Sequence, residues 1–301
     1  MLDKLMTMRE AIAHFVSDGS AVAIGVALES LIPFAAAHEI VRQQRKDLSL
    51  IGPISDMLFD QVIGAGCARR VIAAWVGNVS AGLGHNYRRW TEDGGAQKLS
   101  VEDHSNFTIS LALKAGAMGV PFIPTRSLLG TDLLYSNPSL RVIEDDGMRL
   151  VRVPAVNPDV TIVHVQRSDA EGNAHCWGNL GISEEAALAA RQVIVVAEEI
   201  VPPSVIRSDP NRVLVPALKV CAVVHEPGGA HPSPVQGHYE RDHAMYHDYH
   251  RESRTLDGFT NWLDEWVRGV RDREGYLAKL GPERWSALQA MNVRSAAPVG
   301  Y

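Results

Sequence analysis

Short continuous runs of apolar residues alternate along this chain with longer segments in which apolar residues recur every three or four positions. Runs of about 4–8 apolar residues are typical of strands buried on both faces, and the longer repeat is typical of amphipathic helices. The pattern predicts strands at residues 21–25, 48–51, 70–76, 97–101, 160–166, 193–197 and 219–224. It predicts helices at residues 8–16, 33–44, 54–63, 85–92, 105–118 and 184–191. Thr7 with Glu10 three residues later is a capping-box pattern that marks the start of the first helix.

The order of these elements indicates the fold class. Strands separated by helices form parallel sheets with helices packed on the faces. We therefore predict an α/β fold with a mostly parallel, doubly wound sheet flanked by helices. The helix at residues 105–118 carries mainly Phe, Ile, Leu and Ala, so we expect it to lie well inside the protein or against a neighbouring chain.

The C-terminal quarter differs in composition from the rest of the chain. Histidines gather between His225 and His250, and residues 256–280 suit one amphipathic helix with Phe259, Trp262 and Trp266 on one face. We predict an α/β domain over residues 1–225 and a helical extension over residues 226–301, packed on the same domain. Three patterns in the middle of the chain are weaker. They predict an extended stretch at residues 120–124, a loop at residues 125–132 and a half-exposed strand at residues 141–153.

One βα unit is a candidate ligand site. Asp18-Gly19 is a turn pair before the strand at residues 21–24, and Pro33 suits the first turn of the next helix. Ligands of open α/β sheets lie beyond the carboxyl ends of strands, where Gly25 would let the backbone direct N–H groups at a developing anion. On spacing alone, the unit also fits an ordinary βα connection. The glycine-rich residues 77–84 likewise fit either a loop at the ligand-binding edge of the sheet or a tight connection.

Composition narrows the classes of partner. With 301 residues and 46% hydrophobic content, the chain can bury one large core or two modest ones. The formal net charge of −6 supplies no broad cationic field, so we expect neither nucleic acid nor a membrane as partner. We find no apolar run of about 20 residues and no signal peptide, and the three cysteines are far apart. A reduced, cytoplasmic location is therefore expected.

A metal site is a weaker alternative. His243 and His247 would share one face if their segment is helical, which is a spacing that zinc sites use. A hydrolase of the His-Glu-x-x-His type would need a glutamate that this segment lacks, and the cysteines lie elsewhere. We therefore expect no metal, and a surface or interface role for these histidines.

The first βα unit resembles the first signature of class I coenzyme A-transferases, although Val26 and Leu31 stand where the signature has glycines. Later motifs resemble the A subunits of the glutaconate type of these enzymes. They are Gly116 to Pro124 with Arg126, Gly130 and Asp132, the turn Asp169-Ala170-Glu171-Gly172-Asn173, the run Gly229-Ala230-His231-Pro232-Ser233, and Glu265-Trp266 before Tyr276-Leu277-Ala278-Lys279-Leu280-Gly281. The resemblance covers residues 7–281.

The resemblance implies a reaction and a partner. In these enzymes a glutamate carboxylate attacks an acyl-CoA thioester, and CoA passes through a glutamyl-CoA thioester to a free carboxylic acid. That glutamate lies in a Glu-Asn-Gly-type sequence of the B subunit, and no such sequence occurs here. The resemblance therefore implies a heteromer with a B subunit. It also implies that the substrates are an acyl-CoA and a carboxylic acid, with no permanently bound cofactor.

The resemblance also implies roles for particular residues. The backbone N–H groups of Gly25, Val26 and Ala27 would bind the oxyanion, and Asn78 and Ser80 would donate to the acyl group or to the partner's glutamate.

Glu29, Ser30 and Arg126 are candidate acyl or CoA contacts. Since the loop before Pro33 lacks the basic residues of the glutaconate enzyme, an apolar acyl chain is expected over a dicarboxylate. Glu102 is the one candidate catalytic side chain, and its alternative role is that of an ion-pair partner near a helix start.

Two other functions stay open. In a hydrolase branch of the superfamily, which cleaves CoA thioesters or steroid rings, the A chain carries a catalytic glutamate at a place that Ser105 or Asn106 occupies here. The same fold also serves as a ligand-sensing domain in transcription regulators. These need a DNA-binding segment, and the residues before Ala21 hold only one predicted helix.

Overall fold

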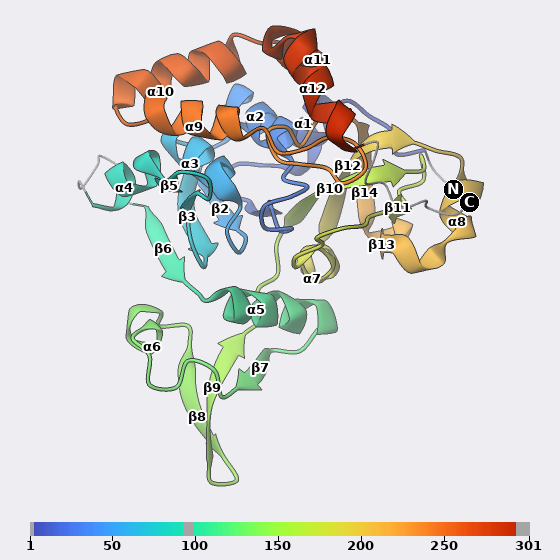
Figure 1. Ribbon diagram of the computed structural model, residues 1–301. Coiled ribbons are helices and arrows are strands. Elements are labelled where there is room, and N and C mark those ends of the chain that lie inside the picture. The colour runs from blue at the N-terminus through green and yellow to red at the C-terminus, as the bar shows by residue number, and fades with distance from the viewer. Residues whose placement is uncertain (1–2, 93–98, 293–301) are drawn as a thin grey trace.

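The computed structural model describes residues 3–92 and 99–292. Within these residues a nine-stranded sheet forms the centre, and its parallel strands have the order β14-β12-β10-β1-β2-β3-β6 (Figure 1). Their bounds are β1 Ala21–Ile24, β2 Leu48–Ile51, β3 Ala68–Ala73, β6 Ser100–Asp103, β10 Val160–Ser168, β12 Gln192–Ile200 and β14 Val220–His225. Two short strands, β11 Ala174–His175 and β13 Val213–Val215, continue the sheet in the antiparallel sense.

Helices cover both faces of this sheet, which confirms the predicted α/β class. On one face lie α1 Met8–Phe15, α2 Phe34–Arg42 and α3 Asp56–Gly64, and on the other α5 Asn106–Met118 and α7 Ser183–Ala189 (Figure 1). Residues of β1 alternate between the two cores, since Val22 and Ile24 belong to the first and Ala23 to the second. The continuous apolar runs of the sequence therefore arise because both faces of each strand are buried.

The first turn of α1 forms as its sequence predicts. The Thr7 hydroxyl accepts from the Glu10 N–H at 3.2 Å, and the Glu10 carboxylate accepts from the Thr7 N–H at 2.9 Å. This reciprocal pair satisfies N–H groups that have no partner within the helix.

The extension packs against the first core through α9 His243–Glu252, α10 Leu256–Leu263 and α11 Arg273–Leu280. The single helix expected at residues 256–280 is wrong. After α10 the chain makes a π-helical turn at Asp264–Arg268, and α11 starts afresh from Asp272, whose carboxylate caps the Gly275 N–H at 2.9 Å. A local cap therefore overrides the long apolar repeat.

One further prediction needs correction, and a second is answered only in part. The expected strand at residues 141–153 is a hairpin of β8 Arg141–Asp145 and β9 Met148–Pro154, because Asp146 and Gly147 both adopt positive φ and turn the chain. Within this chain, helix α5 is buried along one side, while Phe107 and Met118 are more than half exposed, so its packing against a neighbouring chain stays a prediction. The strand expected at residues 97–101 is β6, and residues 97–98 lie outside the described residues.

The remaining elements are short, except for α12 with its 11 residues. They are β4 Gly77–Asn78, β5 Gly82–Leu83, α4 His85–Thr91, β7 Phe122–Thr125, α6 Leu133–Ser136, α8 Pro203–Ser208, α12 Pro282–Asn292, and two turns of 3-10 helix at Pro210–Arg212 and Ala217–Lys219. Across the described ranges, no helix has the length and apolar character that a membrane crossing requires.

Candidate functional site

The sheet grows outward in sequence order from β1 to β6 on one side and from β10 to β14 on the other. Open α/β sheets bind ligands where the winding direction changes, at the carboxyl ends of the two central strands. In this protein that place lies between β1 and β10, and the loop at residues 25–33 leaves β1 there.

This loop has an unusual backbone. Gly25 (φ +70°), Leu28 (φ +71°) and Leu31 (φ +53°) all have positive φ, which is a strained conformation for the two leucines. A Cβ at Gly25 would lie 2.8 Å from the Ser55 Cβ, so only glycine fits there. Val26 is not among the residues with positive φ, so its side chain adds no backbone strain at the position where the signature has glycine.

Segments distant in sequence hold the loop in place. The Ile182 N–H donates to the Val26 carbonyl at 2.9 Å, and the Leu31 N–H donates to the Pro234 carbonyl at 3.0 Å. The Ser233 hydroxyl donates to the Glu29 carbonyl at 2.9 Å. The loop's conformation therefore depends on the segment before α7 and on the C-terminal extension.

Two backbone donors in the loop have no acceptor. Among the described residues, neither the Val26 N–H nor the Ala27 N–H donates a hydrogen bond, although each residue is only 2% exposed. An unpaired buried N–H is costly, so these two groups are suited to an acceptor from outside the chain.

Arg241 of the extension connects three loops at this edge of the sheet. Its guanidinium lies 2.5 Å from the Asp56 carboxylate, donates to the Ser80 hydroxyl at 3.0 Å and reaches the Glu29 carbonyl at 3.3 Å. Burial raises the pKa of Asp56 above its ordinary value, while Arg241 and the Val79 N–H act against that rise. The ion pair thus holds a buried carboxylate between the ends of β1, β2 and β4.

The sequence candidates Asn78 and Ser80 lie at this edge but bond within the chain. Asn78 is buried, donates from Nδ2 to the Tyr246 carbonyl at 2.7 Å and accepts from the Ser80 N–H at 3.0 Å. The Ser80 hydroxyl accepts from Arg241. Their proposed contacts with an acyl group stay predictions.

A small cavity of about 280 Å³ opens beside the loop, and Ser30 and Leu31 form part of its wall. The other lining residues are Trp177, Asn179, Pro234, Gln236, Tyr239 and Glu240. The side chain of Glu29 is exposed at the same loop, whereas Arg126 follows β7 in a separate sheet and makes no hydrogen bond or ion pair with the described residues of the loop.

Behind this cavity lies a buried polar cluster that sequence reasoning missed. The Tyr239 hydroxyl donates to Glu198 at 2.6 Å, the His164 Nε2 lies 2.7 Å from the same carboxylate oxygen, and the Gly228 N–H donates to the other oxygen at 2.7 Å. Burial acts to raise the pKa of Glu198, but the bonds from His164, Tyr239 and Gly228 hold it below its ordinary value. No local motif joins these residues, because they come from β10, β12 and the extension.

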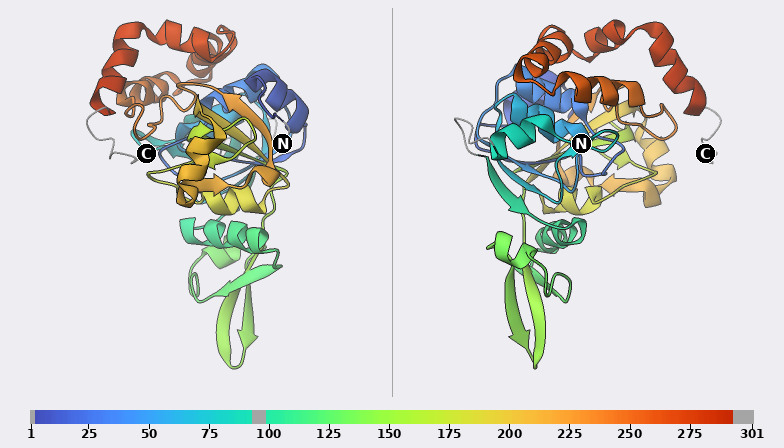
Figure 2. Two further views of the ribbon diagram at one scale, coloured as in Figure 1. Left: turned by 90° about the vertical axis from the view of Figure 1, so that its right-hand side faces the viewer. Right: turned by 60° about the vertical axis from the view of Figure 1, so that its left-hand side comes forward.

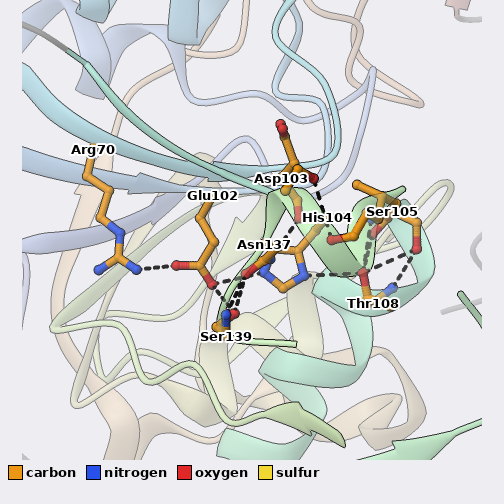
Figure 3. A network of polar contacts seen from close by, with 10 residues as sticks. Arg70, Glu102, Asp103, His104, Ser105, Thr108, Asn137 and Ser139 are labelled. Carbon is orange, nitrogen blue, oxygen red and sulfur yellow. Dashed lines mark hydrogen bonds and ion pairs between the residues drawn. The ribbon is translucent and has the colours of Figure 1, made fainter. Parts of the chain in front are cut away.

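Glu102 lies at the end of β6 in a second network (Figure 3). Its carboxylate accepts from the Ser139 hydroxyl at 2.9 Å, lies 3.2 Å from the His104 Nε2 and pairs with Arg70. The His104 bond, with those from Ser139 and Arg70, outweighs desolvation and lowers the pKa of Glu102 to about 2. A carboxylate that stays ionised at neutral pH is not a general acid, and this geometry favours the ion-pair role.

His243 and His247 are both exposed on α9. In the part of the chain that the structure describes, no three His, Cys, Asp or Glu side chains are grouped so that they could hold a metal ion.

Comparison with known proteins identifies the family. The model of the coenzyme A transferase family matches residues 5–226. The chain is 42% identical over 279 residues to the A subunit of 3-oxoadipate CoA-transferase from Pseudomonas knackmussii, a match that covers 92% of this chain and 98% of that protein. It is 32% identical over 319 residues to the A subunit of glutaconate CoA-transferase from Acidaminococcus fermentans, a match that covers 100% of this chain and 97% of that protein.

The fold agrees with this assignment. The crystal structure of glutaconate coenzyme A-transferase from Acidaminococcus fermentans matches with a TM-score of 0.89 and covers 95% of each chain. The chain therefore belongs to the coenzyme A transferase family. The resemblance drawn from the Gly25 and Gly229 motifs is confirmed at this level.

The Arg241–Asp56 pair gives a first testable prediction. Arg241→Met is expected to lower the free energy of unfolding by about 3–5 kcal/mol, because it leaves the buried Asp56 carboxylate unpaired. The double variant Arg241→Met/Asp56→Asn removes that charge and should recover part of the loss, as urea unfolding measures. Arg251→Met, at an exposed pair with Asp248, is the control and should cost less than about 1 kcal/mol. An equal loss in the single and double variants would contradict the buried-charge explanation.

Glu102 gives a prediction of pH dependence. Its pKa is lowered from 4.5 to about 2 on folding, so its contribution to stability is present above pH 4.5 and is lost as the pH falls toward 2. We expect Glu102→Gln to destabilise the protein at pH 6, and the difference from wild type to shrink as the pH falls through this window. Urea unfolding at a series of pH values measures this. A difference that does not change with pH would show that Glu102 acts through packing alone.

Proposed function

We propose that this chain is the A subunit of a heteromeric CoA-transferase, which moves CoA between an acyl-CoA and a free carboxylic acid. The observation that carries the proposal is the pair of unpaired, buried N–H groups of Val26 and Ala27 at the carboxyl end of β1. Two such donors match the oxyanion that forms when a nucleophile adds to a thioester. Relatives that match over nearly the full chain are named as the A subunits of such enzymes.

The nucleophile would come from a B subunit. Its glutamate carboxylate would add to the thioester carbonyl, and the oxyanion would accept hydrogen bonds from the Val26 and Ala27 N–H groups. Loss of the CoA thiolate breaks the C–S bond and leaves an acyl anhydride. The thiolate then adds to the glutamyl carbonyl of that anhydride, which releases the first acid and forms a glutamyl-CoA thioester. The acceptor carboxylate reverses these steps.

Three carboxylates of this chain are already bonded within it, which supports a nucleophile from another chain. Asp56 is paired with Arg241, Glu102 with Arg70 and His104, and Glu198 with His164 and Tyr239. A carboxylate held by several donors is a weak nucleophile, because its charge is already stabilised. CoA is then a substrate rather than a resident cofactor of this chain.

The hydrolase alternative has less support. It would use a glutamate early in the helix after β6, and the first turn of α5 carries no acidic residue, with Ser105 as its cap. Transfer and hydrolysis are separated in one assay, since transfer requires the acceptor acid and hydrolysis requires only water.

The first experiment reconstitutes the enzyme. The chain is produced with a CoA-transferase B subunit that carries the Glu-Asn-Gly sequence, and exchange of CoA between an acyl-CoA and labelled free acids is measured. We expect exchange only when both chains are present. After incubation with acyl-CoA alone, the mass of the B chain should increase by that of bound CoA. Turnover by this chain alone, or a CoA adduct on it, would contradict the proposal.

The choice of acceptor acids in this assay tests which acyl group the enzyme prefers. The loop itself offers no cation, and the nearby Arg241 is neutralised by Asp56, which favours an apolar acyl chain. The relative named for 3-oxoadipate points instead to a dicarboxylate. Monocarboxylic acids are therefore compared with glutaconate and 3-oxoadipate of similar length. Much faster transfer to the two dicarboxylates would reject the apolar preference but not the reaction class.

The oxyanion wall gives a matched pair of variants. A Cβ at Gly181 (φ +54°) would lie 2.4 Å from the Val26 carbonyl oxygen and 2.7 Å from the Ala27 Cα. Gly181→Ala should therefore displace both N–H groups and lower kcat/KM of the reconstituted enzyme by about 10²-fold.

Gly130→Ala is the control, because Gly130 also has positive φ (+81°) but open space around it. The Gly130→Ala substitution should introduce backbone strain but leave kcat/KM within about threefold of wild type. Melting temperatures of both variants show that they are folded in the assay. Equal activity of Gly181→Ala and wild type would exclude the loop from the reaction.

A further inference from the structure

After α5, the chain from β7 to β9 forms an arm that projects from the body of the protein (Figures 1 and 2). It holds β7 and the β8–β9 hairpin in a separate antiparallel sheet, and a small core of Ala112, Leu140, Val151 and Val153 joins that sheet to α5. The hairpin extends beyond this core, and its Val142 and Met148 side chains are 43% and 50% exposed. The arm therefore presents apolar surface away from the main sheet.

The outer strand of the arm, β8, has an open edge. The sheet order is β7-β9-β8, and among the described residues no strand pairs with the far side of β8. The two-residue turn at Asp146 and Gly147 makes Asp145 and Met148 a hydrogen-bonded pair, and such pairs alternate along a hairpin. Val142 and Glu144 consequently direct their N–H and C=O groups outward, where they have no partner in the described chain.

The two ends of β8 carry opposite charges that are not neutralised within the described residues. Arg141 lies opposite another cation, Arg152, across the hairpin, and it makes no ion pair there. Asp145 lies opposite Met148 and also has no ion-pair partner in the described part of the chain. Like charges opposite each other in a sheet are unfavourable, so Arg141 would gain from a carboxylate on its other side.

We propose that β8 pairs edge to edge, antiparallel, with β8 of a second copy of this chain. With Ile143 opposite Ile143 of the other copy, Val142 lies opposite Glu144, and the outward groups of these residues form four backbone hydrogen bonds around a two-fold axis. In the same register, Arg141 of each copy lies opposite Asp145 of the other. Two three-stranded sheets thereby join into one continuous sheet.

The charges select this register over its neighbours. A shift by two residues in one direction places Glu144 opposite Glu144, and a shift in the other places Arg141 opposite Ile143. Either shift loses both ion pairs, and the first adds a repulsion. An edge that bears charges is normally protected from pairing, but the charges on β8 are self-complementary. The contact is small, so we expect a weak dimer that salt weakens further.

Cysteine cross-linking tests the register directly. In the dimer, Ile143 and its copy form a non-hydrogen-bonded pair with a Cα–Cα distance of about 4.5 Å, which a disulfide can bridge. Ile143→Cys in the full chain should form a disulfide-linked dimer under mild oxidation. Met148→Cys, which is more exposed than Ile143 but lies on β9, is the control and should not. The native Cys67 and Cys176 are buried and Cys221 is half-buried, so the wild-type chain under the same oxidation sets the background. Equal cross-linking of both variants, or of neither, would overturn the proposal.

Charge reversal tests the ion pairs. Arg141→Asp and Asp145→Arg should each raise the dimer dissociation constant at least about 10-fold, because each turns two attractions into repulsions. The double variant restores both pairs and should return to within about threefold of wild type, as sedimentation equilibrium of the full chain measures. Arg207→Asp on the exposed face of α8 controls for net charge. A monomeric wild type, or a double variant no better than the single ones, would refute the pairing. Neither outcome bears on the transfer reaction.

Discussion

The buried ion pair of Arg241 and Asp56 is the interaction on which the edge of the sheet depends. Asp56 starts α3 with both carboxylate oxygens occupied, since one accepts from the Met57 and Val79 N–H groups and the other from Arg241. The guanidinium lies over the Tyr246 ring at 3.7 Å, which fixes it from the side of α9. One charge of the extension therefore sets the positions of the loops that follow β1, β2 and β4.

This constraint explains how a strained loop persists. Leu28 and Leu31 hold positive φ at a cost that the loop's own residues do not offset. The compensating bonds come from Ile182, Ser233, Pro234 and Arg241, so the loop is held from outside. Since most of these partners belong to the extension, residues 226–292 are part of the site's structure and not a separate addition to the sheet.

The sequence predicted the elements whose signals are local or periodic, and little of what joins them. Local signals were sufficient to predict β1, β2, β10 and the start of α1. These signals are the apolar runs of the strands and the capping box of Thr7 and Glu10, because burial on both faces and helix capping act over a few residues. Gly25 was marked by a similarly local pattern, and its role at an oxyanion stays a prediction. Arg241, Glu198 and His164 were missed, since no periodicity marks a polar residue that pairs across the fold. The Asp146-Gly147 turn was a local signal and was overlooked.

The candidate hydrogen-bond donors form two groups, those already bonded within the chain and those that are not. The family resemblance implied that Asn78 and Ser80 are donors, but their polar groups are bonded to Tyr246, Arg241 and each other. Diverting the Asn78 amide to a substrate would take the donor from the Tyr246 carbonyl, whereas the Ser80 hydroxyl accepts from Arg241 and can still donate its own proton. The Val26 and Ala27 N–H groups carry no such penalty, because nothing in the described chain accepts from them. Backbone donors held by a rigid frame are also preorganised, which is what stabilisation of an oxyanion requires. These two N–H groups are therefore backbone donors of the loop that stay available to an acceptor from outside the described chain.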